Sequence, residues 1–453
     1  EFDEGAGFDD TDPRNAYGPY FQRQRVEIYH TYAKSLVERG LAYPCFCTEE
    51  ELDKVRAKQE EDKVLTGYYG EYATCRNLSY EEIEANIKAG KPYVLRLRSQ
   101  GSPDKEITFV DAIKGEIKLP ENIHDIVLLK KDGIPTYHFA HAIDDHLMRT
   151  TTVVRGGEWL ASAPIHYELF HLLGFKMPAY AHTAHLMKFD EETGGKRKLS
   201  KRKDPELSLD YYRKDGYHPY TMKVYLLTLL NSNFEEWHEK FPDKDINEFP
   251  FSVEKMNQSG ALFDKDKLHN ICKNELSKLS EEELYDFLYD WAKENEPENV
   301  EKWFGDREKM LQILRLYMGV GAKRRRKDLM YAKQIFELIS YFFDGESAEE
   351  MDEFKLDEDM VSKILKSYLA KYDHNDDNSV WFNKLKEIAD EHGFASDMKA
   401  YKANPENFKG NVSDIAEAVR IAVTGRANTP DLWTIVHIMG EEQMTERIKK
   451  HIK

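Results

Sequence analysis

Apolar positions in the first 120 residues change from helical to strand-like spacing. Between Phe21 and Arg39 they recur every three or four residues and Gly40 follows, which predicts a helix that ends there. Short extended segments come next: YPCFC, the alternating YVLRLRS at Tyr93–Ser99, ITFVDAI and EIKLP. Their alternation and their β-branched residues predict short strands.

The stretch from Asp125 to Leu186 mixes strand and helix signals. The strings DIVLLKKDGIPTYHFAHAIDDHLM and TTVVRGGEWL are apolar strand candidates separated by polar turns, and Ala163–Leu173 has helical spacing. Because a helix between two strands is the usual connection in a parallel sheet, this stretch predicts a strand-and-helix unit of an α/β domain.

Beyond Asp204 the pattern becomes helical almost throughout. Segments such as EEELYDFLYDWAKEN, REKMLQILRLYMGVG, MVSKILKSYLAKY and DIAEAVRIAVTG carry apolar residues at a period of about 3.6. Strand signals nearly vanish, and there is no internal repeat at a fixed period. We therefore expect an α/β N-terminal half and an all-α C-terminal half.

Length and charge narrow the class of protein. A chain of 453 residues is too long for one core and predicts several domains. The net charge of −18, from 83 Asp and Glu against 65 Lys and Arg, opposes indiscriminate nucleic-acid binding but allows an RNA that meets local basic patches. We expect a cytoplasmic protein without a membrane span, since no apolar run reaches about 18 residues, no signal peptide begins the chain and four cysteines do not form a secreted disulfide pattern.

Two basic segments interrupt this acidic background: KRKLSKRK at residues 196–203 and KRRRK at residues 323–327. In the first, Lys198 and Lys201 flank Ser200 just after two glycines. Paired lysines on a flexible loop can close over a polyphosphate and neutralise the charge that develops as pyrophosphate leaves. A run of nuclear-localisation type, or charge that is merely solvated, is the alternative interpretation.

The string KLSKR resembles the KMSKS signature of class I aminoacyl-tRNA synthetases, and its surroundings are similar to the glutamyl-tRNA synthetases of bacterial type. The similar strings are FDEG at Phe2–Gly5, YGPYFQRQR, the CxC segment, IPTYHFAHAIDDHLMRTTTVVRGGEWLASAPIHYELFHLLGF, GALFDKDKL and VTGRANTPDLW. They follow family order and spacing from end to end.

The resemblance implies an α/β and all-α multidomain fold with a partial Rossmann-type catalytic domain. It implies the following domains: the end of the first catalytic half at 1–42, an acceptor-binding insertion at 43–125, the second catalytic half at 126–203, a stem-contact helical domain at 204–300 and a helical anticodon-binding domain at 301–453. The family's His-Ile-Gly-His motif and LRIEDTD segment, which precede FDEG, do not occur in this sequence. We therefore expect the chain alone to be a poor catalyst.

The resemblance implies that ATP activates L-glutamate and that the terminal adenosine of tRNA then accepts the glutamyl group. Catalysis falls to Lys198, Ser200, Lys201 and Arg202, and ATP, which brings Mg²⁺, is bound by Lys198, Lys201 and Leu186. The glutamate pocket matches Tyr137, His141, Arg155 and Trp159; many relatives carry Asn at the position of His141, and Trp159 either walls the pocket or only packs there. A guanidinium suits a carboxylate because it is planar, bidentate and always charged.

The cysteines raise the question of a metal site. Cys45, Cys47 and Cys75, with Tyr68 between them, resemble the CxC…Y…C zinc site of some family members, and thiolates suit tetrahedral Zn²⁺. Tyr72 is a rival for the fourth ligand, and three free thiols are the alternative. Cys272 is expected to lie on a helix and to be buried in the protein core.

The implied partner is tRNA(Glu). In the family the insertion contacts the acceptor end and C-terminal helices read the anticodon. The basic run Lys323, Arg324, Arg325 and Arg326 opens the latter region and is a candidate for phosphate contact. The expected state is a monomer. The alternatives are a tRNA-binding fragment without activation chemistry and a glutaminyl-tRNA synthetase, although the latter ends in β-barrels.

Overall fold

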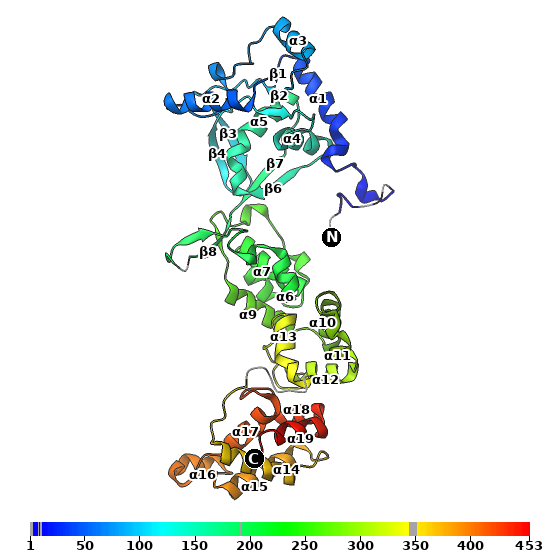
Figure 1. Ribbon diagram of the computed structural model, residues 1–453, viewed down its shortest axis with the longest axis vertical. Coiled ribbons are helices and arrows are strands. Elements are labelled where there is room, and N and C mark those ends of the chain that lie inside the picture. The colour runs from blue at the N-terminus through cyan, green and yellow to red at the C-terminus, as the bar shows by residue number, and fades with distance from the viewer. Residues whose placement is uncertain (1–2, 8, 10, 191, 344–350) are drawn as a thin grey trace. The chain divides into compact units, whose positions relative to one another are not determined.

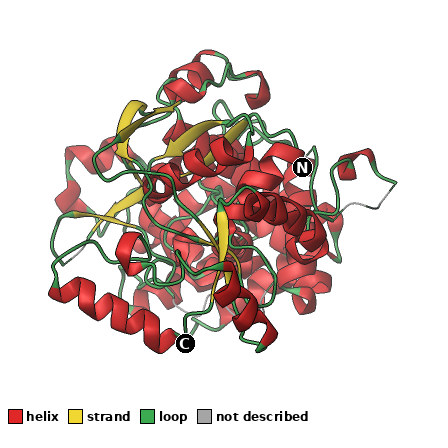
Figure 2. Ribbon diagram, turned by 90° about the horizontal axis from the view of Figure 1, so that it is seen from above, coloured by secondary structure: helices red, strands yellow, loops and turns green. Residues whose placement is uncertain are grey.

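The computed structural model describes residues 3–7, 9, 11–190, 192–343 and 351–453, so Phe2 of the FDEG string lies outside the described residues. The chain forms two compact units. The first unit comprises the chain up to Lys198 together with Leu229–Leu262, and the second comprises Leu199–Thr228 and Phe263–Lys453. Figure 2 shows that helices predominate over strands.

Three small sheets lie in the first unit. The first sheet is antiparallel, with the order β1 (Ala42–Cys45), β2 (Val94–Leu97) and β5 (Val127–Leu129). The second has the order β4 (Gly115–Pro120), β3 (Glu106–Asp111), β7 (Ala179–Thr183) and β6 (Thr152–Gly156), and its β3, β7 and β6 are parallel. The third joins β10 (Ala261–Leu262), β8 (Leu186–Phe189) and β9 (Lys196–Lys198).

The first unit also contains the helices α1 (Val26–Glu38), α2 (Glu49–Glu61), α3 (Tyr80–Lys88), α4 (Tyr137–Leu147) and α5 (Ala163–Leu173), which lie around the sheets in Figure 1. The helix α8 (Phe234–Lys240) belongs to the same unit. Buried side chains of α1, α4 and α5 pack with those of β1, β2 and β5 in one core that includes Tyr29, Leu97, Phe139 and Phe170. This core fixes α4 and α5, which carry much of the candidate site.

The expected parallel unit is confirmed, because α5 connects the parallel strands β6 and β7. The expectation of a strand over the whole of residues 125–148 is wrong: only β5 is extended there, and α4 follows. Thr136 after Pro135 begins this helix, and its buried residues Phe139, Ala140 and Ile143 lie on one helical face. The helix expected from Phe21 begins as an α-helix only at Val26, after a 3₁₀ turn.

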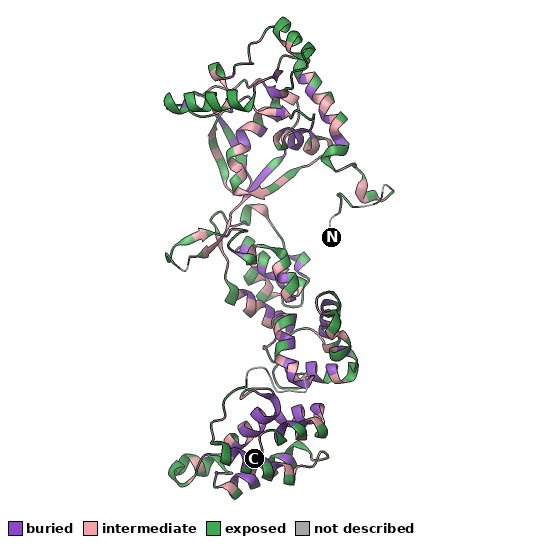
Figure 3. Cartoon of the chain, in the orientation of Figure 1, coloured by how far each residue is buried: buried purple, intermediate pink, exposed green. Residues whose placement is uncertain are grey.

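The second unit is helical, as expected. Its helices are α6 (Leu209–Asp215), α7 (Pro219–Leu230, ending in the first unit), α9 (Lys265–Leu276), α10 (Glu281–Asn295), α11 (Val300–Phe304), α12 (Arg307–Met318), α13 (Ala332–Ile339), α14 (Glu358–Lys371), α15 (Asn378–His392), α16 (Met398–Ala403), α17 (Val412–Thr424), α18 (Leu432–Met439) and α19 (Glu441–Lys449). Buried side chains of α10 to α15 and α17 to α19 meet in a large core, and these segments include much of the purple ribbon in Figure 3. Cys272 is buried in α9, as predicted.

Local sequence explains where several of these helices begin. Thr48, Ser79 and Ser280 each cap a helix and face a glutamate three residues later, and each pair forms a reciprocal capping box. Among the described helices, none is both long enough and apolar enough to cross a membrane.

Candidate active site

Strand register brings three polar side chains together in the first unit. Arg155 on β6 is the direct neighbour of His182 on β7, because the two parallel strands pair these residues. Asp111 ends β3 on the other side of β7, where it pairs with Tyr180. The sheet thus aligns an arginine, a histidine and a carboxylate from segments far apart in the sequence.

Arg155 is held by three acceptors. Its Nε–H donates to His182 Nε2 at 2.9 Å, Nη1 contacts His166 Nδ1 at 3.1 Å, and Nη2 donates to the carbonyl oxygen of Trp159 at 3.4 Å. A guanidinium has five N–H donors, so two remain for a ligand. The guanidinium also lies over the ring of Tyr180, 4.7 Å from its centroid.

Three histidines close to Arg155 are neutral: His138, His166 and His182. Burial lowers the pKa of His166 to about 2, and the nearby His141 and the Arg155 charge act in the same direction. Burial also lowers the pKa values of His138 and His182, and the charge of Arg155 contributes to each. Neutral imidazoles can accept hydrogen bonds from the guanidinium without repelling it.

Aromatic side chains surround the same place. The Tyr137 ring lies 4.6 Å from that of Trp159 and is stacked on His141 at 5.7 Å. His141 Nε2 contacts the Tyr180 hydroxyl at 2.7 Å, and its Nδ1 lies 3.0 Å from Asp145. The four residues that the resemblance placed in the glutamate pocket are therefore neighbours, and Trp159 borders the site with both its ring and its carbonyl group.

Four further residues of the site escaped the sequence analysis: Asp111, His138, His166 and His182. His166 lies on α5 and is fully buried, and His138 Nδ1 contacts its Nε2 at 2.9 Å. The sequence signal that could have pointed to the three histidines is the concentration of histidine within residues 138–182 of a chain that has 16 histidines in all. A buried histidine needs hydrogen-bond partners, and Arg155 was already a candidate in the same stretch.

The KLSKR segment spans the boundary of the two units. In the first unit, Leu186 begins β8 and Lys198 ends β9, where its ammonium lies 4.0 Å from Glu158. In the second unit, Ser200 forms a turn with Asp204, whose carboxylate accepts from its backbone N–H at 2.7 Å. Lys201 and Arg202 are exposed on this turn.

The predicted zinc ligands converge. The sulfur atoms of Cys45, Cys47 and Cys75 all lie within 4.8 Å of one another. The Tyr68 hydroxyl is 3.4 Å from the sulfur of Cys45 and 3.3 Å from that of Cys47. The Tyr72 hydroxyl instead donates to Asp62 at 2.9 Å, so it is not the fourth member of this cluster.

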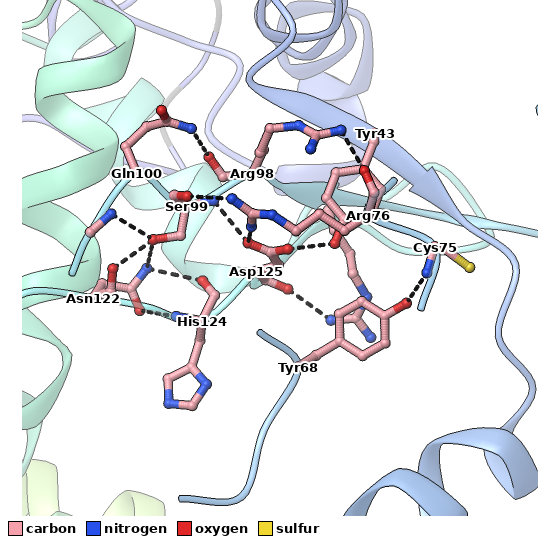
Figure 4. Close-up of polar contacts among 12 residues, drawn as sticks. Tyr43, Tyr68, Cys75, Arg76, Arg98, Ser99, Gln100, Asn122, His124 and Asp125 are labelled. Atoms are coloured by element: carbon pink, nitrogen blue, oxygen red, sulfur yellow. Dashed lines mark hydrogen bonds and ion pairs between the residues drawn. The ribbon is translucent and has the colours of Figure 1, made fainter. Parts of the chain in front are cut away.

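A buried carboxylate supports this cysteine cluster (Figure 4). Asp125 is fully buried and accepts from the Tyr43 hydroxyl at 2.5 Å, from Ser99 N–H at 2.9 Å and from the Arg76 guanidinium. Its own N–H donates to the carbonyl oxygen of Tyr68 at 2.8 Å. Because Arg76 directly follows Cys75, the network fixes both Tyr68 and Cys75.

The second basic run lies between α12 and α13. Lys323, Arg324 and Arg325 are exposed. Arg326 pairs with Asp328 at 2.6 Å, and Lys327 donates to Asn274 at 2.7 Å. The first three side chains are therefore better placed to meet an anion than the last two.

The chain is similar to known proteins over nearly its whole length. Residues 7–270 match the model described as tRNA synthetases class I (E and Q), catalytic domain, and residues 283–452 match an anticodon binding domain. A glutamate–tRNA ligase of Acetivibrio thermocellus is 53% identical over 99% of this chain and 82% of its own length. One of Clostridium perfringens strain SM101 is 46% identical over 100% of this chain and 82% of its own.

Solved structures extend the similarity. The crystal structure of a glutamate tRNA ligase from Elizabethkingia meningosepticum, in complex with its amino acid, has a TM-score of 0.73 at 26% identity, with 98% of this chain and 86% of that chain covered. The glutamate–tRNA synthetase of Elizabethkingia anophelis has a TM-score of 0.71 at 27% identity, with 96% and 84% covered.

Proposed function

The chain belongs to the class I glutamate–tRNA ligases, and we propose how its residues divide the ligation of glutamate to tRNA among them. ATP enters as its Mg²⁺ complex. The glutamate α-carboxylate attacks the α-phosphate and expels pyrophosphate, and the terminal adenosine hydroxyl of tRNA then attacks the mixed anhydride. No covalent enzyme nucleophile is needed, so positioning and charge neutralisation do the catalytic work.

Arg155 binds the side-chain carboxylate of glutamate, and Tyr137, His141 and Trp159 wall the pocket. The observation that supports this most strongly is that three acceptors hold the guanidinium and two N–H donors remain. A carboxylate accepts two such bonds, whereas the amide of glutamine can accept through its oxygen but sets its NH₂ group against the second donor.

The test is glutamate-dependent ATP–pyrophosphate exchange by the complete protein, run with tRNA present. Arg155→Lys should raise the KM for glutamate about 10–100-fold, the cost of one lost charge-assisted hydrogen bond, and leave the KM for ATP nearly unchanged. Exchange with glutamine but not glutamate would favour a glutaminyl enzyme. Binding of tRNA without any exchange would favour a tRNA-binding protein.

Lys198 and Lys201 neutralise the triphosphate as pyrophosphate leaves, with Ser200 and Arg202 shaping the turn and Leu186 bordering ATP. Lys198 is half-exposed beside Glu158, and Lys201 is exposed, so both ammonium groups can turn to a phosphate. Lys201→Gln should lower kcat about 10²–10³-fold. Lys203→Gln, on the same turn, is the matched control; an equal loss in both variants would remove the specific role of Lys201.

Zn²⁺ fits the cysteine cluster, because three sulfur atoms and one phenol oxygen supply the four ligands that it prefers. Cys45, Cys47, Cys75 and Tyr68 would hold it, and its work there is structural. We expect one zinc per chain by elemental analysis after purification in metal-free buffer. Tyr68→Phe should weaken retention against a chelator, and Tyr72→Phe should not. A zinc-free, fully active protein would exclude the site.

The exposed run at Lys323–Arg325, with the paired Arg326, contacts tRNA phosphates. Replacing both Arg324 and Arg325 with Gln should weaken tRNA binding and reduce the slope of log K against log salt by about two. Lys293→Gln, on α10 of the same unit, is the control for the loss of a positive charge outside the run. An unchanged slope in the double variant would place the tRNA backbone elsewhere. A cytoplasmic monomer completes the proposal.

A further inference from the structure

A continuous chain of polar groups runs behind the guanidinium of Arg155. It begins at Asp111, whose Oδ2 lies 2.6 Å from His182 Nδ1, and reaches Arg155 through His182 Nε2 at 2.9 Å. From Arg155 it continues through His166, at 3.1 Å, to His138, at 2.9 Å. Nothing in the activity itself requires these four residues, so their alignment needs its own explanation.

The donors and acceptors along this series of contacts determine which ring nitrogen of each histidine carries the proton. Arginine only donates, so His182 must accept at Nε2 and carry its proton on Nδ1, from which it donates to Asp111. In the same way His166 must accept at Nδ1 and donate from Nε2, which leaves His138 accepting at Nδ1. Only one set of tautomers satisfies all four contacts.

Asp111 is the anchor of this set. Its side chain is fully buried, and it accepts from the backbone N–H groups of Ile113 at 3.0 Å, Lys114 at 2.9 Å and His182 at 3.1 Å. Burial by itself would raise the pKa of Asp111, but the hydrogen bonds from His182 and these backbone groups outweigh it and lower the pKa. The carboxylate is therefore charged and immobile, and it can only accept.

We propose that Asp111, His182 and His166 are positioning residues that fix the orientation of Arg155 and thereby set the preference of the site for a carboxylate over a carboxamide. The inference rests on the proposed role of Arg155. Held by three acceptors, the guanidinium keeps one free N–H on Nη1 and one on Nη2. A carboxylate can accept from both, whereas a carboxamide accepts through its oxygen only and sets its NH₂ group against the other N–H, which leaves donors unsatisfied. A guanidinium free to rotate could lend one donor to an amide oxygen and would discriminate less.

The first test is Asp111→Asn, which keeps the size of the anchor and changes its chemistry. Its amide can turn NH₂ toward His182 Nδ1, which stabilises the opposite tautomer and sets His182 Nε2–H against Arg155 Nε–H. We expect the KM for glutamate in pyrophosphate exchange to rise about 10–100-fold and the KM for ATP to change less than about twofold. The ratio of kcat/KM for glutamate over glutamine should fall as well. Unchanged glutamate KM and unchanged ratio in a folded variant would overturn the proposal.

A second pair of variants decides the matter even if Asp111→Asn fails to fold. His166→Asn places an amide oxygen near the position of Nδ1 and keeps an acceptor for Arg155, whereas His166→Leu removes it. We expect His166→Leu to raise the KM for glutamate and His166→Asn to leave it much closer to that of the unsubstituted protein. Equal KM values for glutamate in the two variants would mean that His166 only fills space, and the proposal would be wrong.

Combination with Arg155→Lys separates this inference from the proposed function. If Asp111 acts only through Arg155, Asp111→Asn adds little to the KM for glutamate once Arg155 is already lysine. An unaltered glutamate KM in Arg155→Lys alone would refute the role of Arg155. A raised KM in Arg155→Lys with none in the Asp111 and His166 variants would refute the positioning chain and leave the proposed function intact.

Discussion

His166 makes the stability of the first unit depend on pH, and His166→Asn should remove its share of that dependence. In the folded state this side chain is fully buried and neutral, with its pKa lowered to about 2. In the unfolded chain a histidine takes up its proton near pH 6.5. Below that pH the unfolded state therefore binds one proton more than the folded state, and stability falls as the pH falls.

The size of the effect follows from the interval between the two pKa values. Each pH unit below about 6.5 costs about 1.4 kcal/mol of unfolding free energy, so His166 removes about 2 kcal/mol between pH 6.5 and pH 5.0. The pKa values of His138 and His182 are lowered as well, so the unsubstituted protein loses more than this in total. The difference between it and the His166→Asn variant isolates the share of His166.

Urea unfolding at pH 7.5 and pH 5.0 measures this share, with pulse-labelling hydrogen exchange read on peptides of α5 so that the first unit is followed separately. The deficit of His166→Asn relative to the unsubstituted protein should shrink by about 2 kcal/mol at the lower pH. Leu169→Met, on the same helix, is the control and should cost the same at both pH values. An equal deficit for His166→Asn at both pH values would show that the buried imidazole does not titrate differently on unfolding.

Three further outcomes test the fold around the cysteine cluster. Tyr43→Phe deprives the buried Asp125 of a donor and should cost about 1.5–3 kcal/mol in urea unfolding, whereas Tyr80→Phe on the surface should stay within about 0.5 kcal/mol. Thr48→Ala removes the cap of α2 and should cost about 1 kcal/mol, seen as faster hydrogen exchange in that helix only. Dialysis against a chelator should lower the urea midpoint for unfolding of the first unit, and added Zn²⁺ should restore it. An unchanged midpoint would argue against a bound metal.

The helical half of the chain could be predicted from the sequence because most of its helices bury one face and several begin at a recognisable cap. Ser280 and Glu283, for example, form the capping box that starts α10. The segment 125–148 was misread because an apolar run bounded by turns fits a buried strand and a buried helix equally well. Packing against α1 and α5 decides that residues 137–147 form a helix.

The candidate site likewise contains residues that the sequence could indicate and residues that only the fold brings together. Residues that belong to a motif, such as Arg155 and Lys198, could be proposed from the resemblance. Asp111 could not, because it is 71 positions from His182 and only the pairing of β3 with β7 brings the two together. The cysteine cluster was accessible because thiols are few and their chemistry is narrow, whereas its support by Asp125 depends on tertiary contacts.

The arginines of the first unit differ in whether a carboxylate neutralises them. Arg25 is buried and donates to Asp144 at 2.9 Å, and Arg76 donates to the buried Asp125, so each charge is neutralised where it lies. Among the described residues, no carboxylate lies within ion-pair distance of Arg155; its side-chain acceptors are neutral imidazoles. A carboxylate at their position would hold the guanidinium equally well but would occupy the charge that the substrate must meet. Asp111 instead contacts His182, which in turn contacts Arg155, so the arginine has a charged anchor that does not pair with it directly. Its positive charge stays available for the ligand carboxylate that we propose it binds.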